Sequence, residues 1–246
     1  MSAVRPLRVL VAEDSPVNQR LMRALLGHRG HHVTIAGDGR EALAALAREP
    51  FDVALMDLHM SGLGGLEATA AIRERERAAG GHLPIIALTG SAQSGDRERC
   101  LAAGMDGYLL KPFNAAELIE LIESFPAAGG PPAAPGGRPR PPAGGTGGTI
   151  AAESLPGFDL GAFLADAALL AAEIGGAIAR QDGPSLQGSA HRLVGSAGWF
   201  QAGAVVAWAQ QLEELGKAGE FDSRTASAHQ SLVAELNRMT RDRDLG

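Results

Sequence analysis

Cysteine is almost absent from this chain of 246 residues. The single cysteine, Cys100, cannot form an intrachain disulfide, which indicates a reducing compartment and a cytoplasmic protein. No membrane span is evident either. The apolar run near the N-terminus is far shorter than the roughly 18 residues that a span needs. We expect this run to be a strand rather than a targeting signal, and we expect no insertion into a membrane.

The chain also lacks an excess of positive charge, since its formal net charge is -6 at pH 7. No DNA-recognition helix is recognisable, so we expect protein partners and no nucleic acid. A composition of 45% hydrophobic and 20% charged residues is ordinary for a globular protein, and the length is sufficient for two domains. The turn after the first apolar run, AEDSPVNQ, has no glycine-rich phosphate cradle, which disfavours a nucleotide or flavin site there.

Several short apolar runs in the first half each end in polar residues. The run from Phe51 to Met60 is bounded by Pro50 and a glycine cluster, which is typical of a strand that is buried on both faces. Its carboxylate, Asp57, falls at the carboxyl end. The other runs end in Glu13 and Asp14, in Thr89, and in Lys111. Five alternations of strand and helix predict a doubly wound α/β fold, in which one sheet edge collects these side chains.

The collected side chains predict a site for a phosphoryl group. Three carboxylates, Glu13, Asp14 and Asp57, repel one another unless a cation lies among them, and Mg²⁺ prefers such oxygen ligands. Lys111 and Thr89 add an ammonium and a hydroxyl, which suit phosphoryl oxygens. An aspartate at a strand end can also simply begin a turn, so the inference depends on the whole set.

With these residues in place, residues 5–125 resemble the receiver domain of two-component response regulators. The family has an acidic pair after strand one, a phosphoacceptor aspartate after strand three, Thr or Ser after strand four, and Lys-Pro after strand five. The resemblance implies a flavodoxin-like, five-stranded parallel sheet in the order 2-1-3-4-5. The turn DSPVNQ, from Asp14 to Gln19, resembles receivers of hybrid kinases, so the chain could be part of one.

The resemblance also implies a role for each site residue. Asp57 accepts the phosphoryl group, and Asp14 and Asp57 bind Mg²⁺ together with the backbone carbonyl of His59. Glu13 supports the metal through water, while Thr89 and Lys111 hold the phosphoryl oxygens. Tyr108 matches an aromatic residue that reorients on activation, and the bond from Lys111 to Pro112 is commonly cis in the family. The chain departs from the family at Ser61 and Gly64, which replace the usual Pro and Asp and bear on loop rigidity and phospho-aspartate lifetime.

A segment rich in Pro, Gly and Ala, residues 126–152, follows the first domain. It has almost no apolar bulk to bury, so we expect a flexible linker. Beyond it the strand signals vanish, and residues 153–243 show helical apolar spacing with short connections. The expected helices, which predict an all-α four-helix bundle, cover residues 158–178, 185–200, 204–218 and 224–241.

The predicted helix 185–200 carries one histidine, His191. At about 100° per residue, the apolar stripe of this helix lies roughly 140° from His191, so we expect the imidazole to face solvent. Three glycines, Gly188, Gly195 and Gly198, surround it on its face. Each costs a helix interior about 1 kcal/mol, and clearance for an approaching protein would explain them. A lone histidine on a helix is more often a surface or packing residue.

The segment around His191 resembles a histidine phosphotransfer (Hpt) domain, whose motif reads A-H-x-L-K-G-S. The corresponding residues here run from Ala190 to Ser196, and Leu212 with Glu213 also matches the family. The chain departs at Val194, where the family usually has a lysine that attracts the phosphoryl group. Arg192 could compensate, although it points about 100° away from His191. The resemblance implies that the imidazole, whose ordinary pKa of about 6.5 lies close to neutral pH, exchanges a phosphoryl group with an aspartate.

Together these features predict a phosphorelay protein that is a phosphotransfer intermediate rather than an enzyme, with no ATP site of a kinase. The expected partners are a sensor or hybrid histidine kinase and possibly a downstream response regulator. One alternative is an interaction module, in which phosphorylation of Asp57 shifts Thr89 and Tyr108 and the bundle docks partners without transferring phosphate. Another is an aspartyl-phosphate phosphatase, which would want a second Asp where His59 stands.

Overall fold

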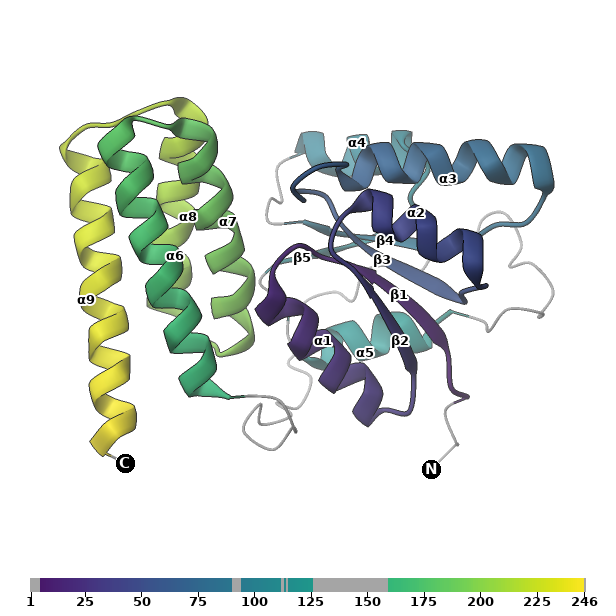
Figure 1. The fold of residues 1–246 in the computed structure, drawn as a ribbon, viewed down its shortest axis with the longest axis horizontal. Coiled ribbons are helices and arrows are strands. Elements are labelled where there is room, and N and C mark those ends of the chain that lie inside the picture. The colour runs from purple at the N-terminus through teal and green to yellow at the C-terminus, as the bar shows by residue number, and fades with distance from the viewer. Residues whose placement is uncertain (1–4, 90–93, 112, 114, 126–158, 246) are drawn as a thin grey trace. The chain divides into compact units, whose positions relative to one another are not determined.

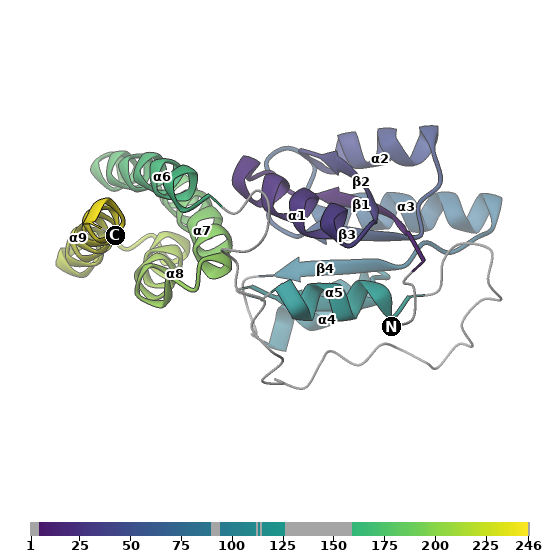
Figure 2. The same ribbon diagram turned by 90° about the horizontal axis from the view of Figure 1, so that it is seen from below.

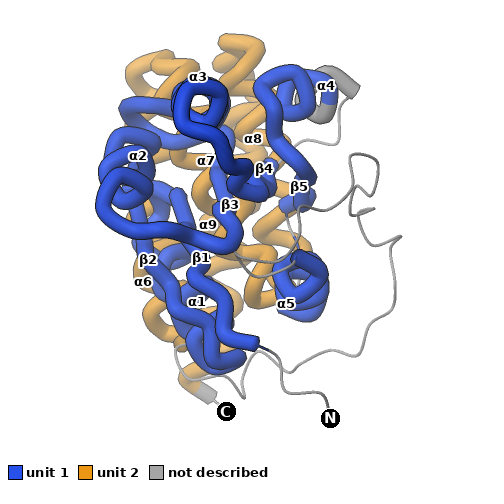
Figure 3. The backbone as a smooth tube through the Cα atoms, turned by 90° about the vertical axis from the view of Figure 1, so that its right-hand side faces the viewer, with its two compact units in different colours: residues 1–158 blue, residues 159–246 orange. Residues whose placement is uncertain are grey.

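A computed structural model describes residues 5–89, 94–111, 113, 115–125 and 159–245. The chain divides into two compact units, Met1–Phe158 and Asp159–Gly246, which Figure 3 distinguishes by colour. Each unit is described below by itself. The predicted linker, Pro112 and Asn114 lie outside the described residues.

The described part of the first unit contains a five-stranded parallel sheet in the order β2-β1-β3-β4-β5, as predicted. The strands are β1 (Arg8–Ala12), β2 (His32–Ala36), β3 (Val53–Asp57), β4 (Ile85–Thr89) and β5 (Gly107–Leu110). Every residue of β3 and β4 is buried, which explains their unbroken apolar sequences. In the register, Ala12 pairs with Met56, Asp57 with Leu88, and Thr89 with Leu110. The parallel strands therefore end at one edge.

Helices follow the strands and cover both faces of the sheet. They are α1 (Pro16–His28), α2 (Gly39–Arg48), α3 (Gly65–Ala79), α4 (Ser94–Ala102) and α5 (Ala115–Glu123). Figure 1 shows α1 and α5 on one face and α2, α3 and α4 on the other. The sheet with two helical layers is the doubly wound fold that the sequence predicted.

Helix ends in this unit follow from local chemistry. Ser15 caps α1, where its hydroxyl accepts from the Asn18 N–H, and Pro16 stands in the first turn, where its missing N–H costs no hydrogen bond. Asp38 caps α2 by accepting from the Glu41 N–H at 2.8 Å. The Glu41 carboxylate in turn accepts from the N–H of Gly37, which makes a reciprocal cap one residue earlier than its standard position.

The described part of the second unit is a bundle of four helices, as predicted. They are α6 (Leu160–Arg180), α7 (Gly183–Trp199), α8 (Gly203–Ala218) and α9 (Ser223–Leu245). Figure 2 shows these helices nearly end-on, each beside two others. Their apolar faces meet in one core, where Phe163 stacks on Phe200 with ring centroids 4.5 Å apart. This cluster is the main source of stability for the bundle.

Helix α6 is long and apolar enough to cross a membrane by length and composition alone, although no span was expected from the sequence. Its apolar residues have another explanation in the structure. Phe163, Leu164, Leu170 and Ile174 are buried in the bundle core. The helix is therefore the core helix of the bundle, and its high mean hydropathy reflects an outer face in which alanine is frequent.

Candidate functional site

The predicted acidic residues meet at the carboxyl edge of the sheet. Glu13 and Asp14 follow β1 directly, and Asp57 is the last residue of β3. One carboxylate oxygen from each of the three lies within 4.8 Å of the others. Asp57 and Glu13 are each only 1% exposed. The sheet thus gathers three carboxylates at one point, and hard oxygen donors at this spacing suit Mg²⁺.

Lys111, immediately after β5, reaches into this acidic cluster. Its Nζ donates to Asp57 Oδ2 at 2.5 Å and to Glu13 Oε2 at 3.0 Å. Burial alone would lower the pKa of Lys111, but Asp57 and then Glu13 outweigh burial and raise it. Burial also raises the pKa of Glu13 to about 7, where Lys111 opposes the change and Asp57 adds to it. The buried ammonium is therefore firmly charged and neutralises part of the cluster.

Further hydrogen bonds hold the three acids from different sides. Glu13 Oε1 accepts from the Ser15 N–H at 3.2 Å and from the side-chain amide of Asn18 at 3.0 Å. Asp14 Oδ2 accepts from the Ser61 N–H at 3.3 Å. Asp57 Oδ1 accepts from the N–H of His59 at 3.1 Å. Each acid thus has a hydrogen-bond donor of its own, and for Asp14 that donor lies on the loop after β3.

Two further predicted residues lie near the same edge. Thr89 is the last residue of β4 and is 2% exposed, and its carbonyl accepts from the Lys111 N–H at 2.6 Å. Tyr108 is half-buried on β5, in register with Ala87. The sheet therefore brings Thr89 to the carboxyl edge with Lys111, while Tyr108 lies within the neighbouring strand.

A glycine behind Asp57 permits the close approach of α3 to β3. A Cβ on Gly65 would lie 2.2 Å from the backbone oxygen of Asp57 and 2.9 Å from Met56 Cγ. Real Cβ atoms do not approach a carbonyl so closely, so only glycine fits unless the loop shifts. The glycine cluster that ended the apolar run in the sequence therefore lets the helix begin directly behind the phosphoacceptor candidate.

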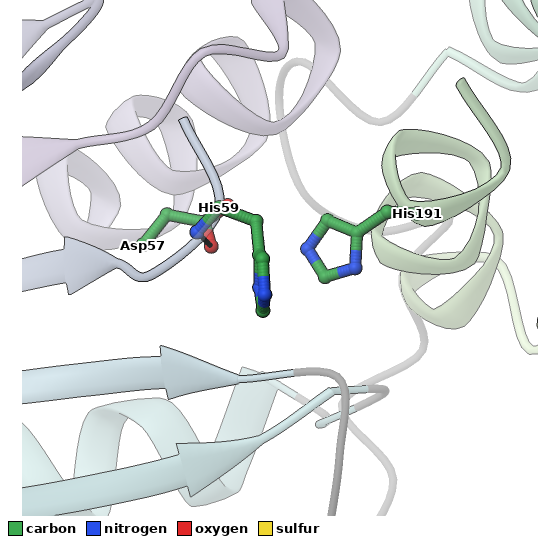
Figure 4. A group of neighbouring side chains, drawn as sticks. All are labelled: Asp57, His59 and His191. Atoms are coloured by element: carbon green, nitrogen blue, oxygen red, sulfur yellow. Dashed lines mark hydrogen bonds between the residues drawn. The ribbon is translucent and has the colours of Figure 1, made fainter. Parts of the chain in front are cut away.

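The second unit positions His191 on α7 through a partner on α8. The imidazole Nδ1 lies 2.9 Å from Glu213 Oε1. Figure 4 draws His191 on its helix, and it draws Asp57 and His59 at the end of β3. Within the bundle, the ring edge that carries Nδ1 turns toward α8, and the exposure of the rest of the imidazole to solvent stays a prediction. The spacing of apolar residues gives the angle of His191 around its own helix, but it does not reveal that Glu213 on α8 is its partner.

Neither Arg192 nor Val194 places a positive charge beside His191. Arg192 donates to Glu173 Oε2 at 2.6 Å and to Ser189 Oγ at 3.1 Å, on the side of α6. Val194 is fully buried in the core cluster of the bundle. The proposed compensation by Arg192 is therefore not seen, since its charge is paired with Glu173. By contrast, a Cβ on Gly188 would meet nothing within 4 Å, consistent with the predicted clearance.

The hydrogen bonds made by Glu213, Glu173 and Asn18 were not predicted from the sequence. Glu213 appeared only as a match to a family pattern, and its contact with His191 spans 22 positions of sequence. Glu173 lies 19 positions from Arg192. Both contacts depend on how the helices pair, which local periodicity does not reveal. Asn18 was quoted in a turn motif without a role, although its place in the first turn after Glu13 was a usable signal.

Comparisons with known proteins match the two units separately. The family model for the response regulator receiver domain matches residues 9–123, and that for the Hpt domain matches residues 160–242. Hybrid signal transduction histidine kinase I of Dictyostelium discoideum is 47% identical over 128 residues, which are 50% of this chain and 7% of that protein. An uncharacterized 14.6 kDa protein of Leptolyngbya boryana is 35% identical over 125 residues, 51% of this chain and 94% of that protein.

A solved structure gives a similar match. The receiver domain of sensor histidine kinase PA1611 from Pseudomonas aeruginosa, determined with a magnesium ion coordinated in its active-site cleft, is 42% identical. The match covers 49% of this chain and 98% of that domain, with a TM-score of 0.45. The chain thus spans a small part of the curated kinase that it matches, and nearly all of a separate receiver domain.

Proposed function

Because the chain consists of a response regulator receiver domain at residues 9–123 followed by an Hpt domain at residues 160–242, it belongs to the two-component signalling families. We propose that it passes phosphoryl groups in a phosphorelay, with Asp57 and His191 as the two acceptors. The observation that carries this proposal is the buried contact of Lys111 with Asp57 inside a cluster of three carboxylates.

The chemistry at Asp57 is an in-line phosphoryl transfer. A carboxylate oxygen of Asp57 attacks the phosphorus of a phosphohistidine on a partner kinase, the new O–P bond forms as the P–N bond breaks, and the imidazole nitrogen keeps the electron pair. Asp14, Asp57 and the His59 carbonyl would hold Mg²⁺, with Glu13 acting through water, and the ion would neutralise charge on the phosphoryl oxygens.

The protein side chains supply positioning and charge. The Nζ of Lys111 already lies 2.5 Å from Asp57 Oδ2. When the phosphoryl group binds to Asp57, this ammonium can form an ion pair with a phosphoryl oxygen and neutralise its charge. Thr89, at the adjacent strand end, offers a hydroxyl to the same group. When Thr89 moves toward the phosphoryl group, the side chain of Tyr108 on the neighbouring strand would reorient, and this would alter the surface of the domain near β5.

The chemistry at His191 depends on its tautomer. With Nδ1 donating its proton to Glu213, the basic lone pair resides on Nε2, which we assign as the nitrogen that exchanges phosphoryl with an aspartate. The negative charge of Glu213 makes the imidazole a better nucleophile. Because Arg192 is paired with Glu173 and Val194 carries no charge, we expect cations of the partner receiver to neutralise the phosphoryl group during transfer.

Phosphate tracing tests the proposal. The full chain, Asp57→Asn and His191→Gln are incubated with Mg²⁺ and a labelled phosphohistidine donor, and acyl phosphate is separated from phosphohistidine by their different acid stability. We expect label on Asp57 in the chain and in His191→Gln, and label on His191 that chases onto a receiver. No label on Asp57 would refute the receiver role. Label on His191 in Asp57→Asn would refute transfer in order from Asp57 within one chain.

A second candidate function has its own support in the bundle. Val194 carries no charge and Arg192 is paired with Glu173, so neither supplies a cation to His191, as in a docking domain that has lost transfer chemistry. In that case phosphorylation of Asp57 controls partner binding while His191 never gains phosphate. Phosphorylation-dependent binding by His191→Gln, equal to that of the unmodified chain, would support this alternative.

The proposal also covers the partners of the protein and its location in the cell. The partners would be a sensor or hybrid histidine kinase and a downstream response regulator, and the chain would act as a cytoplasmic phosphotransfer intermediate rather than an enzyme. Helix α6 supports this placement, because its apolar face is committed to the bundle core.

A further inference from the structure

Asn18 is a buried amide beside the acidic cluster that neither sequence reasoning nor the proposed chemistry uses. It lies in the first turn of α1, after the Ser15 cap, and is 1% exposed. Its Nδ2 donates to Glu13 Oε1 at 3.0 Å. The side chain therefore reaches toward the acidic cluster rather than toward the core.

The other half of the same amide is unsatisfied. Asn18 Oδ1 is buried and has no hydrogen-bond partner among the residues that the structure describes. A buried carbonyl oxygen without a donor is unusual in a native protein and calls for an explanation such as a water or an ion. Because Nδ2 is committed to Glu13, the oxygen is the end that remains for another group.

Both carboxylate oxygens of Glu13 already accept hydrogen bonds. Its Oε2 accepts from Lys111, and its Oε1 accepts from Ser15 and Asn18. A carboxylate so held has a fixed orientation, which is what a group that supports a metal through water needs. Asn18 is the side chain that fixes Oε1, since the other donor to this oxygen is a backbone N–H.

We propose that Asn18 is a positioning residue for Mg²⁺: its Nδ2 holds Glu13, and its Oδ1 accepts a hydrogen bond from a water of the hydrated ion. This inference rests on the proposed magnesium site and adds a neutral member to it. A neutral amide supplies an acceptor where a fourth carboxylate would increase the repulsion among Glu13, Asp14 and Asp57. Mg²⁺ usually keeps several waters, so outer acceptors of this kind contribute to its affinity.

Mg²⁺ titration of the full chain by calorimetry tests the proposal. Asn18→Leu keeps the approximate volume and removes both hydrogen bonds, and we expect it to raise the Mg²⁺ Kd about tenfold or more. The matched control is Gln19→Leu. The Gln19 amide also contacts Glu13, at 2.6 Å, but it donates to the backbone oxygen and not to the carboxylate. We expect the Kd of this control to stay within about twofold of the unmodified chain.

A second readout does not depend on phosphoryl transfer. At one fixed Mg²⁺ concentration well above the Kd, the stabilisation against urea grows with the logarithm of the affinity, so the gain in midpoint should shrink in Asn18→Leu and persist in Gln19→Leu. Asn18→Ala gives the same comparison with a good helix former if the leucine does not fit. Its unfolding in EDTA reports any purely structural loss.

The outcomes separate this inference from the proposed function. An unmodified chain that binds Mg²⁺ through Asp14 and Asp57, with Asn18→Leu or Asn18→Ala binding within twofold of it, would overturn the role of Asn18 alone. Equal losses in Gln19→Leu would also overturn it, because they would reflect a general disturbance of α1. Absence of Mg²⁺ binding by the unmodified chain would overturn both proposals.

Discussion

Replacing Lys111 by Met tests the electrostatic design of the receiver site without any phosphoryl donor. The ammonium is buried and contacts two buried carboxylates, on Asp57 and Glu13. At 3.0 Å and an effective dielectric constant of about 20, one such contact contributes about 5 kcal/mol before desolvation. Desolvation offsets much of this gain. Removing one member of a buried ion pair nevertheless costs about 3 to 5 kcal/mol, because the remaining charges lose their partner.

We therefore expect Lys111→Met to destabilise the receiver by about 3 to 5 kcal/mol at neutral pH in EDTA. The lower end applies if Glu13 binds a proton, since its pKa is raised to about 7. Saturating Mg²⁺ should recover part of the loss, because the ion supplies the missing positive charge. The double variant Lys111→Met with Glu13→Gln removes one uncompensated charge and should be more stable than Lys111→Met alone.

Urea unfolding of the full chain measures these changes with an internal control. Both tryptophans, Trp199 and Trp208, lie in the Hpt unit, so tryptophan fluorescence follows the bundle while far-UV circular dichroism follows both units. The fluorescence transition should stay unchanged in Lys111→Met while an earlier transition appears in the dichroism. A loss below about 1 kcal/mol in EDTA would refute the reasoning, because it would mean that the three charges are solvated or rearrange freely.

Three further predictions concern separate parts of the chain. Burial lowers the pKa of His31 below its ordinary 6.5, so the unfolded chain takes up this proton at a higher pH than the folded chain does. Stability should therefore fall as the pH drops below 6.5, and the urea midpoints of His31→Gln, followed by dichroism, should depend less steeply on pH. Gly65→Ala should destabilise the receiver by about 1 to 3 kcal/mol or more in the same assay, whereas Gly107→Ala, where a Cβ meets nothing within 4 Å, should change stability little. Glu213→Leu should slow phosphorylation of His191 about tenfold or more, Glu213→Gln should slow it less, and equal rates in single-turnover labelling would contradict the assigned tautomer.

Much of the receiver could be predicted because its signals are local. Continuous apolar runs identify buried strands, and Ser15 and Asp38 mark helix starts by the bonds that they make. The parallel topology then forces the strand ends to one edge, so Asp57 and Lys111 meet although 54 positions separate them. The site followed from the fold, and the fold followed from patterns within single elements.

The bundle was less predictable because its decisive contacts join different helices. Helical spacing predicted four helices and their core, but it did not indicate that α8 brings Glu213 to His191. The position of Arg192 on its helix was known, but its pairing with Glu173 on α6 was not. Periodicity defines the angle of a side chain around its own axis, and only packing decides which neighbour occupies that direction.

The receiver site can form only when nearly the whole domain has folded, because its residues are far apart in the sequence. Its side chains come from the ends of β1, β3 and β4 and from Lys111 after β5, so the nascent chain must be synthesised almost to the end of this domain before they can meet. A chain that has formed only the first three strands presents Asp57 without its ammonium. Partly folded or truncated copies would therefore compete poorly for phosphoryl groups, and the signal would be carried by completed receivers.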